Sequence, residues 1–392
     1  MKKKVLFMVI NMNVGGTEKA LLNMIDVMPE DKYDITILML EKYGGFLNAI
    51  PPRVNVEYLD GYREMKEILN KPPKTVIMNF IKNWNLVKAI YFMLLFFITA
   101  INKERSLLFS GLLHEKVISP KEYDVAIAYA GPMDFISYFI VEKIKAKKKY
   151  QWIHFDVSNI GFNIKFASKF YRAFDKVFTV SKEGKNQLLT LVPSLKSKTE
   201  VFINVTNPEK IVDLAKEGNG YRDDFNGIRI LTVGRLSKEK GQDLLIPVLA
   251  QLKSEGFNIR WYCIGEGSAR KEYEEMIKEY GIENDFLLMG SKSNPYTFMQ
   301  QSDLYVQPSR HEGYCLTLAE AKCFHIPIVS TDFAGVGEHI TDRKTGLIAK
   351  ADSKSIYNAV KDILEDSRLR NEMIYNLKIN NVNGLCFQNL DL

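Results

Sequence analysis

Two glutamates, Glu312 and Glu320, stand eight positions apart where the sequence changes from a strand pattern to a helix pattern. Ionised carboxylates accept strong hydrogen bonds from hydroxyl groups, so a carboxylate at each end of this segment suits sugar and ribose hydroxyls. Two solvated glutamates around the start of a surface helix would give the same spacing. The pair is therefore a candidate for binding a sugar-containing ligand, and the alternative of two solvated glutamates without a binding role stays open.

A basic loop in the second half of the chain offers the complementary charge. Arg235 and Lys240 occupy one strand-to-helix loop, which begins at Gly234 and ends at Gly241. The Arg guanidinium is a planar fork of donors and the Lys ammonium is a compact charge, so together they suit a diphosphate. A basic protein also gathers such residues by chance. A further glycine pair, beginning at Gly265, leads into another helix start in the same half.

A short strand and a short helix must hold the two carboxylates. Residues 304–306 are an apolar run of strand character, and residues 317–323 contain helix formers in sequence. Gly313 lies between them, where a chain that leaves a buried strand needs backbone freedom. In an open α/β sheet such a loop lies beyond the carboxyl end of the strand, where ligands bind and free N–H groups favour phosphate.

Strand-like apolar runs alternate with helical patterns along the whole chain. The predicted strands are residues 5–10, 35–40, 54–58, 123–128, 150–153, 177–180, 200–203, 228–233, 259–264, 286–289, 304–306 and 326–330. This alternation predicts the α/β class, with two doubly wound, Rossmann-like domains that face each other across a cleft. We expect domains at residues 1–205 and 226–370, a linker at 206–225 and a tail at 371–392.

The loops of the first half carry weaker signals. The first predicted strand leads into Gly15 and Gly16, which let backbone approach a phosphate or a sugar, although a tight turn explains them equally well. We expect Thr17 to cap the helix that follows. His154 ends a predicted strand, where its imidazole can donate to a ligand hydroxyl or be a satisfied core histidine. Ser181 is expected to cap a helix.

Composition bounds the class of protein. The chain has 392 residues, 46% hydrophobic and 26% charged, enough to bury the cores of two domains. Its net charge of +6 is too small for a dedicated nucleic-acid binder but fits phosphorylated ligands or an anionic membrane. Residues 5–10 are too short for a signal peptide, so we expect a cytoplasmic protein. The cysteines lack disulfide and metal-ligand spacings, so we expect free thiols: Cys263, Cys315, Cys323 and Cys386.

Residues 82–105 differ from the rest of the chain. Their central part, residues 89–101, has no charge and includes four aromatic residues, with basic residues on both sides. The run is too short to span a bilayer, which needs about 20 apolar residues, but it can lie in the membrane interface. An ordinary buried helix is the alternative. The lysines within residues 143–149 favour a membrane-facing first domain, although a solvated face explains them equally well.

Together these segments resemble the retaining glycosyltransferases of family GT4, which have the two-domain GT-B fold. The resemblance covers about residues 3–365, and its motifs occur in the family's order. Glu312 and Glu320 fit the family's Glu-x7-Glu motif. The other matching residues are Gly15–Gly16, His154, Val180–Ser181, Gly234–Arg235–Leu236, Lys240–Gly241, Gly265–Glu266–Gly267, Ser302–Asp303–Leu304, Pro308–Ser309, Gly335 and Glu338.

The resemblance implies roles for these residues. Arg235 and Lys240 would bind the diphosphate of a nucleotide-sugar donor, and Glu320 would bind its ribose. The implied catalytic residues are Arg235, Lys240, His154 and Glu312, with His154 contacting the sugar or placing the acceptor. Further donor contacts would come from Gly15, Gly16, Gly265, Tyr314, Cys315, Leu316 and Thr317. The family usually has a small residue where this chain has Cys315, so the sugar selectivity stays open.

The implied function is transfer of a hexose, with retention, from a nucleotide sugar to a saccharide or polyprenyl-linked saccharide in cell-surface polysaccharide synthesis. A UDP-sugar is favoured, and the site is expected to need neither metal nor cofactor because no Asp-x-Asp triplet is present. We expect a cytoplasmic protein, peripheral at the inner face of the membrane through residues 82–105 and 143–149, and no nucleic-acid partner. Two alternatives stay open: a sugar-nucleotide epimerase of the same fold, and a non-catalytic, membrane-associated partner of a glycosyltransferase.

Overall fold

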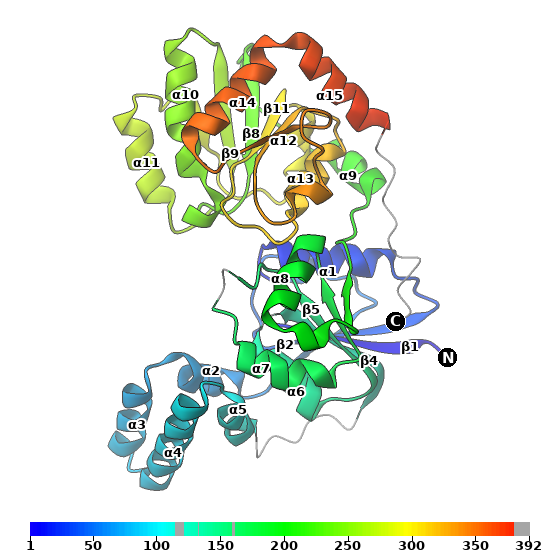
Figure 1. Ribbon diagram of the computed structural model, residues 1–392, viewed down its shortest axis with the longest axis vertical. Helices are drawn as coiled ribbons and strands as arrows, with labels where there is room; N and C mark the ends of the chain where they lie inside the picture. The colour runs from blue at the N-terminus through cyan, green and yellow to red at the C-terminus, as the bar shows by residue number, and fades with distance from the viewer. Residues whose placement is uncertain (114–120, 132, 159–160, 380–392) are drawn as a thin grey trace. The chain divides into compact units, whose positions relative to one another are not determined.

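The computed structural model describes residues 1–113, 121–131, 133–158 and 161–379. The chain divides into two compact units, of which the first contains Met1–Ile203 and the second begins at Asn204. In each unit, helices cover both faces of an open parallel sheet (Figure 1), which confirms the predicted α/β class with two doubly wound domains. The part of the expected tail beyond residue 379, including Cys386, lies outside the described residues.

The first unit is built on a parallel sheet of seven described strands. Their order is β3–β2–β1–β4–β5–β6–β7. The order reverses between β1 and β4, so ligands are expected at the loops that follow these two strands. The strands are β1 (Lys3–Val9), β2 (Tyr33–Met39), β3 (Asn55–Tyr58), β4 (Glu122–Gly131), β5 (Lys145–Ile153), β6 (Lys176–Thr179) and β7 (Thr199–Val201).

Helix starts in the first unit test two capping predictions. Ser181 caps α8, since its hydroxyl accepts from the Gly184 N–H at 3.1 Å, as predicted. The prediction for Thr17 is wrong, because α1 begins at Gly16 and its N-cap is Gly15. The helices are α1 (Gly16–Val27), α2 (Tyr62–Asn70), α3 (Pro73–Lys82), α4 (Leu86–Asn102), α5 (Ser106–Leu113), α6 (Asp134–Lys143), α7 (Ile164–Phe170) and α8 (Lys182–Leu191).

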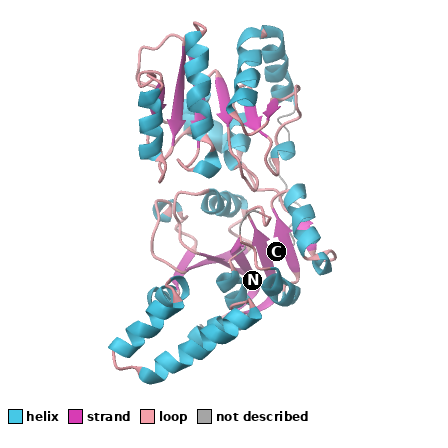
Figure 2. Cartoon of the chain, turned by 60° about the vertical axis from the view of Figure 1, so that its left-hand side comes forward, coloured by secondary structure: helices cyan, strands magenta, loops and turns pink. Residues whose placement is uncertain are grey.

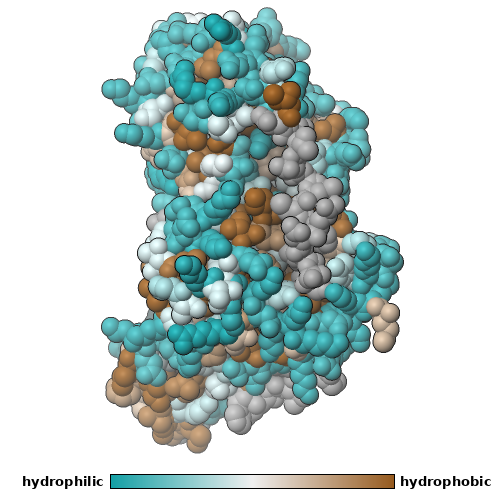
Figure 3. All heavy atoms as spheres, turned by 45° about the vertical axis from the view of Figure 1, so that its right-hand side comes forward, coloured by the Kyte–Doolittle hydropathy of each residue, from teal (hydrophilic) through white to brown (hydrophobic). Residues whose placement is uncertain are grey.

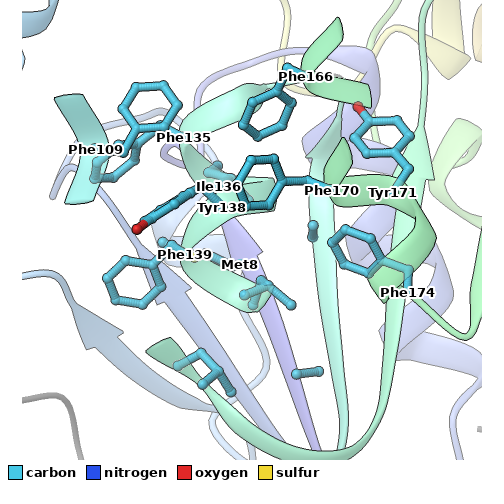
Figure 4. Packing of buried hydrophobic residues seen from close by; sticks show 14 of the residues in the cluster. Met8, Phe109, Phe135, Ile136, Tyr138, Phe139, Phe166, Phe170, Tyr171 and Phe174 are labelled. Carbon is cyan, nitrogen blue, oxygen red and sulfur yellow. The ribbon is translucent and has the colours of Figure 1, made fainter. Parts of the chain in front are cut away.

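Aromatic side chains form much of the core on one face of this sheet (Figure 4). Phe109 of α5 lies edge-on to Phe135 of α6, with ring centroids 5.5 Å apart, and also contacts Phe166 of α7. Phe166 stacks on Phe170 within α7. The burial of these large rings fixes α5 against α6 and α7.

The lysine run of residues 143–149 belongs largely to a strand. The sequence predicted a strand at 150–153, but β5 begins at Lys145. Lys147 pairs with Asp124 of β4 at 2.7 Å, and the Lys149 ammonium donates to the Val141 carbonyl at 2.6 Å. These two lysines therefore have partners inside the unit.

The second unit has a parallel sheet of six described strands, in the order β10–β9–β8–β11–β12–β13. The predicted strands of this half are all present, and β13 was not predicted. The order reverses between β8 and β11, which places the switch point beside the two chemically distinctive loops. The strands are β8 (Ile228–Val233), β9 (Ile259–Ile264), β10 (Phe286–Leu288), β11 (Leu304–Gln307), β12 (Ile328–Thr331) and β13 (Leu347–Ala349).

Residues 206–225, expected as a linker, contain α9, which packs against α12 within the second unit. Its sequence begins with Asn207, whose side chain caps the helix, and Pro208 at the first helical position. The helices of this unit are α9 (Pro208–Ala215), α10 (Leu245–Ser254), α11 (Arg270–Glu279), α12 (Tyr296–Gln300), α13 (Leu316–Lys322), α14 (Ser353–Glu365) and α15 (Ser367–Ile379).

Candidate active site

Two glycines bring the loops at the switch point of the second unit together. Gly265 follows β9 at φ +151°, and a Cβ there would lie 2.0 Å from the Gly234 carbonyl oxygen. Gly241 adopts φ +72°, and its Cβ would lie 2.1 Å from the Pro308 carbonyl oxygen. Any side chain at either position would clash with backbone, so glycine is required for this close approach. The loops after β8, β9 and β11 therefore meet at one place.

An ion pair occupies this place. The Lys240 ammonium lies 2.6 Å from Oε1 of Glu312, and their side chains are 21% and 10% exposed. Ser309 also donates to Oε1 of Glu312, at 2.8 Å. Burial lowers the pKa of Lys240, but the charge and hydrogen bond of Glu312 outweigh it, and the pKa lies above its usual value. The site thus holds a charged ammonium in a largely water-excluded position.

Gln307, at the end of β11, organises the surroundings of Glu312. Its side-chain NH₂ donates to Ser309 at 2.8 Å, and its carbonyl oxygen accepts from Tyr305 at 2.7 Å and from Thr317 at 3.1 Å. Gln307 is almost fully buried. Sequence reasoning missed this residue, although a lone polar side chain at the end of an apolar strand was an available signal. Its network orients the groups that contact Glu312.

Arg235 is the accessible cation of the site. Its side chain is 67% exposed, and its nearest described carboxylate, that of Glu239, is 3.8 Å away on the same loop. Arg235 also lies close enough to Lys240 to oppose its protonation. An exposed guanidinium beside a buried ammonium provides the bidentate fork and the point charge that a diphosphate would need.

Arg310 holds the basic loop in place, and the sequence analysis did not identify it. Its guanidinium pairs with both oxygens of Asp243 at 2.9 and 2.8 Å, and also donates to the Lys238 carbonyl. Its backbone N–H donates to the Glu239 carbonyl at 2.7 Å. The loop of Glu312 and the loop of Arg235 are therefore clamped together by residues outside the predicted site.

Residues 314–317 form the entry to α13. Cys315 is the N-cap residue and adopts φ +65°, a region that L side chains seldom occupy. Its buried thiol lies 3.4 Å from the Thr317 hydroxyl, and burial raises its pKa. The ring of Tyr314 packs against His339, which also bonds the Tyr314 carbonyl, and Leu316 is the first helical residue. The predicted donor-contacting residues 314–317 therefore lie at one helix start, next to the Lys240–Glu312 pair.

Glu320 has a different environment from Glu312. It is buried on α13 and accepts a hydrogen bond from the Tyr296 hydroxyl at 2.8 Å. It is not part of the Lys240–Glu312 ion pair. The two glutamates of the sequence motif are thus held by separate sets of neighbours, as two distinct contacts to one ligand would require.

The remaining predicted residues belong to the first unit. Gly15 and Gly16 begin α1 at the loop after β1, and a Cβ on Gly16 would meet nothing within 4 Å. His154 follows β5 and is buried, with its ring centroid 4.5 Å from that of Tyr129. Burial lowers the pKa of His154 to about 3, and its Nε2 has no hydrogen-bond partner among the described residues. The imidazole is therefore neutral at pH 7, and one of its buried ring nitrogens lacks a described hydrogen-bond partner.

No group of three or more His, Cys, Asp or Glu side chains in the described parts of the chain is arranged to hold a metal ion. None of the described helices is both long enough and apolar enough to cross a membrane.

Comparison with known proteins gives a family match for part of the chain and structural neighbours for its fold. Residues 222–379 match the family described as "Glycosyl transferases group 1". Over 205 residues the chain is 32% identical to the N-acetylgalactosamine-N,N'-diacetylbacillosaminyl-diphospho-undecaprenol 4-alpha-N-acetylgalactosaminyltransferase of Campylobacter jejuni, covering 52% of this chain and 54% of that protein. It is 27% identical to the capsular polysaccharide biosynthesis glycosyltransferase CapM of Staphylococcus aureus, over 37% of this chain and 38% of CapM. The chain thus spans about half or less of these relatives' lengths.

Solved structures share the fold of the chain over nearly its whole length. HepE of Anabaena, in complex with UDP and glucose, has a TM-score of 0.68 at 17% identity and covers 96% of this chain and 94% of its own. TarM also has a TM-score of 0.68, at 15% identity, and covers 97% of this chain and 96% of its own. These similarities support the GT-B fold for the chain.

Proposed function

We propose that the chain, whose residues 222–379 are a domain of glycosyl transferases group 1, transfers a sugar from a nucleotide-sugar donor to a saccharide acceptor. The observation that carries the proposal is the pair of cations at the switch point of the second unit. The largely buried Lys240 pairs with Glu312, and the exposed Arg235 belongs to the same loop as Lys240, at the position where doubly wound sheets bind ligands.

We propose that the donor is a UDP-sugar of the hexose type. HepE binds UDP and glucose on the same fold. The diphosphate would lie against Arg235 and Lys240, the sugar against Glu312 and residues 314–317, and the ribose against Glu320. Gly16 would approach the donor phosphates and His154 the sugar or the acceptor, because each follows a strand of the first sheet on its carboxyl side.

The proposed chemistry relies on charge. Breaking the bond between the sugar and the diphosphate develops negative charge on phosphate oxygens, and fixed cations stabilise this charge more in the transition state than in the ground state. Arg235 and Lys240 would provide that stabilisation without a metal. We propose retention by front-side attack, in which the leaving phosphate accepts the proton of the acceptor hydroxyl.

We propose that the acceptor is a lipid-linked saccharide used in cell-surface polysaccharide synthesis. The Campylobacter relative is named for a substrate carried on undecaprenol diphosphate, and CapM is named for capsular polysaccharide. An enzyme with such an acceptor would act at the inner face of the membrane, as a peripheral protein.

Product analysis tests the proposal. Purified protein would be incubated with a panel of UDP- and GDP-sugars, with and without lipid-linked saccharide acceptors, and the products examined by NMR for the configuration at the new linkage. We expect transfer with the donor's anomeric configuration. Conversion of the donor to an epimer without acceptor would instead identify an epimerase. Donor binding, measured by a rise in thermal stability, without transfer to any acceptor would identify a non-catalytic partner protein.

A further inference from the structure

The apolar residues of α3 and α4 are not buried by the rest of the chain. Figure 2 shows the two helices as a hairpin that extends away from the first sheet. More than half of the large hydrophobic side chains exposed in the described chain belong to residues 78–101: Met78, Ile81, Trp84, Leu86, Val87, Ile90, Tyr91, Met93, Leu94, Phe97, Ile98 and Ile101. This set excludes the interpretation of residues 82–105 as an ordinary buried helix.

The hairpin has a defined inner face. Phe80 of α3 stacks on Phe92 of α4 with ring centroids 5.3 Å apart, and Val76 and Ala89 are also buried. Asn85 caps α4 by accepting from the Lys88 N–H at 3.4 Å. Since these contacts bury only one side of α4, the outer apolar side chains form a continuous helical stripe. A helix that is apolar all round is normally buried, so an external apolar medium or partner must cover the stripe.

Charge identifies the partner. Between Glu67 and Glu104 the chain has no acidic residue, and it carries five exposed lysines: Lys71, Lys74, Lys82, Lys88 and Lys103. Of these, Lys71 pairs with Glu67. Two copies of this surface would repel each other, whereas anionic lipid headgroups would attract it. Trp84, 89% exposed in the turn of the hairpin, and Tyr91 have the apolar ring and polar tip that favour the membrane interface.

Helix length sets the depth of contact. The 17 residues of α4 span about 25 Å, less than the hydrocarbon core of roughly 30 Å. A helix of this length with lysines at its flanks suits the boundary between headgroups and acyl chains. Figure 3 shows hydrophobic side chains gathered at the lower end of the view, where Figure 1 places α3 and α4.

The base of the hairpin is tied to α7, the first helix after β5. The side chain of Asn163, which caps α7, donates to the Lys103 carbonyl at 3.0 Å, and Lys169 of α7 pairs with Glu104 at 3.1 Å. The segment before α7 begins at His154, directly after β5. A bilayer that binds the hairpin is therefore connected through α7 to the carboxyl end of β5, where a ligand would bind.

We propose that the α3–α4 hairpin seats the protein on an anionic bilayer, with α4 in the headgroup–acyl boundary, and so presents the carboxyl edge of the first sheet to a lipid-linked acceptor. The choice of acceptor rests on the proposed function, but the surface itself does not. The lysines of residues 143–149 are not part of this surface, because Lys147 and Lys149 are engaged within the unit.

The protein contains a native reporter for this contact. Of its three tryptophans, Trp152 and Trp261 are fully buried and Trp84 is exposed. Vesicles of phosphatidylglycerol and phosphatidylcholine should shift Trp84 emission to shorter wavelength, and brominated lipids should quench it. The signal should vanish in Trp84→Phe. An unchanged emission with sedimentable, vesicle-bound protein would overturn the proposed contact.

A matched pair of variants tests the stripe. The double variant Leu94→Glu/Phe97→Glu should lower vesicle binding about 100-fold, roughly tenfold for each apolar side chain that no longer enters the interface. Tyr375→Glu is the control, because Tyr375 is as exposed as Phe97, 63% against 64%, but lies on α15. Lys82→Ala should weaken binding to anionic vesicles about fivefold and binding to pure phosphatidylcholine much less.

Other outcomes separate the proposals. Unchanged vesicle binding by a folded Leu94→Glu/Phe97→Glu protein would contradict the proposed membrane surface. A dimer that forms without vesicles and dissociates in this variant would contradict it too. Transfer to a water-soluble saccharide should be unchanged in the variant, while transfer to a lipid-linked saccharide in vesicles should fall at least tenfold. Vesicle binding without any sugar transfer would contradict the proposed enzyme activity but support the proposed membrane surface.

Discussion

Replacing Lys240 should separate the structural role of the ion pair from its chemical role. In Lys240→Met the carboxylate of Glu312 would lose its partner at 2.6 Å while it remains 90% covered by protein. Removing one member of a buried pair typically costs 3–5 kcal/mol, and the residual exposure of both side chains lowers this to about 2–4 kcal/mol. The double variant Lys240→Met/Glu312→Gln should recover most of that loss, because no uncompensated charge stays buried.

Activity should behave differently from stability. Both the single and the double variant lack the ammonium that would face the leaving diphosphate, so both should lose about 10²-fold or more in turnover. Hydrogen exchange of amides in β8 and β11 measures the opening free energy of the second unit alone, and single-turnover transfer measures the chemistry. A double variant as unstable as Lys240→Met would contradict the structural role of the ion pair, and wild-type turnover in either variant would contradict its chemical role.

Because burial holds the pKa of His154 at about 3 rather than 6.5, its contribution to stability is complete above pH 6.5 and is lost as the pH falls toward 3. Between pH 7.5 and 5 the free energy of unfolding of the first unit, measured with denaturant, should fall by about 2 kcal/mol. In His154→Gln the free energy of unfolding should depend much less on pH. Gly265→Ala should cost about 2–4 kcal/mol because its Cβ meets backbone, whereas the control Gly256→Ala, in open space, should cost about 1 kcal/mol, as thermal unfolding would report. Arg310→Lys should lose the two-oxygen contact to Asp243 and raise the donor KM severalfold, and an unchanged KM would show that the basic loop is held without that clamp.

Most of the fold follows from the sequence because parallel strands covered on both faces appear as continuous apolar runs. β1, β8 and β9 are clear examples, since their central residues are almost all buried. The strand β13 has only three residues and a weaker apolar signal, so it was missed. The lysine-rich start of β5 was not recognised because its pairing with β4 depends on contacts such as Lys147–Asp124, which local composition does not encode.

The charged residues of the candidate site could be predicted from the sequence, but most of the residues that hold them in place could not. Lys240 and Glu312 follow neighbouring strands, and parallel topology alone places such loops side by side. Gln307 was missed because it lies within a strand and its contact with Glu312 is formed only in the folded chain. Arg310 was missed because its partner, Asp243, is distant in the sequence. The partnership of Glu320 with Tyr296 likewise depends on α12 packing beside α13.

One local prediction failed, and one open alternative is decided by the fold. Thr17 has the preferred residue type for a helix cap, but Gly15 is the last extended residue and the helix starts before Thr17 is reached. For residues 89–101 the sequence left open both a helix in the membrane interface and an ordinary buried helix. Among the described elements, α3 and α5 make the main contacts with α4, and its outer stripe stays exposed.

The most direct test compares two cations of one loop. The side chain of Arg235 is exposed, whereas that of Lys238, in the same loop, pairs with Glu272 at 2.5 Å. If the basic loop stabilises a leaving diphosphate, Arg235→Ala should lower the rate of sugar transfer from the preferred nucleotide sugar by about 10²-fold or more, and Lys238→Ala by less than about threefold. Equal rates in Arg235→Ala and the unaltered protein would contradict the central claim.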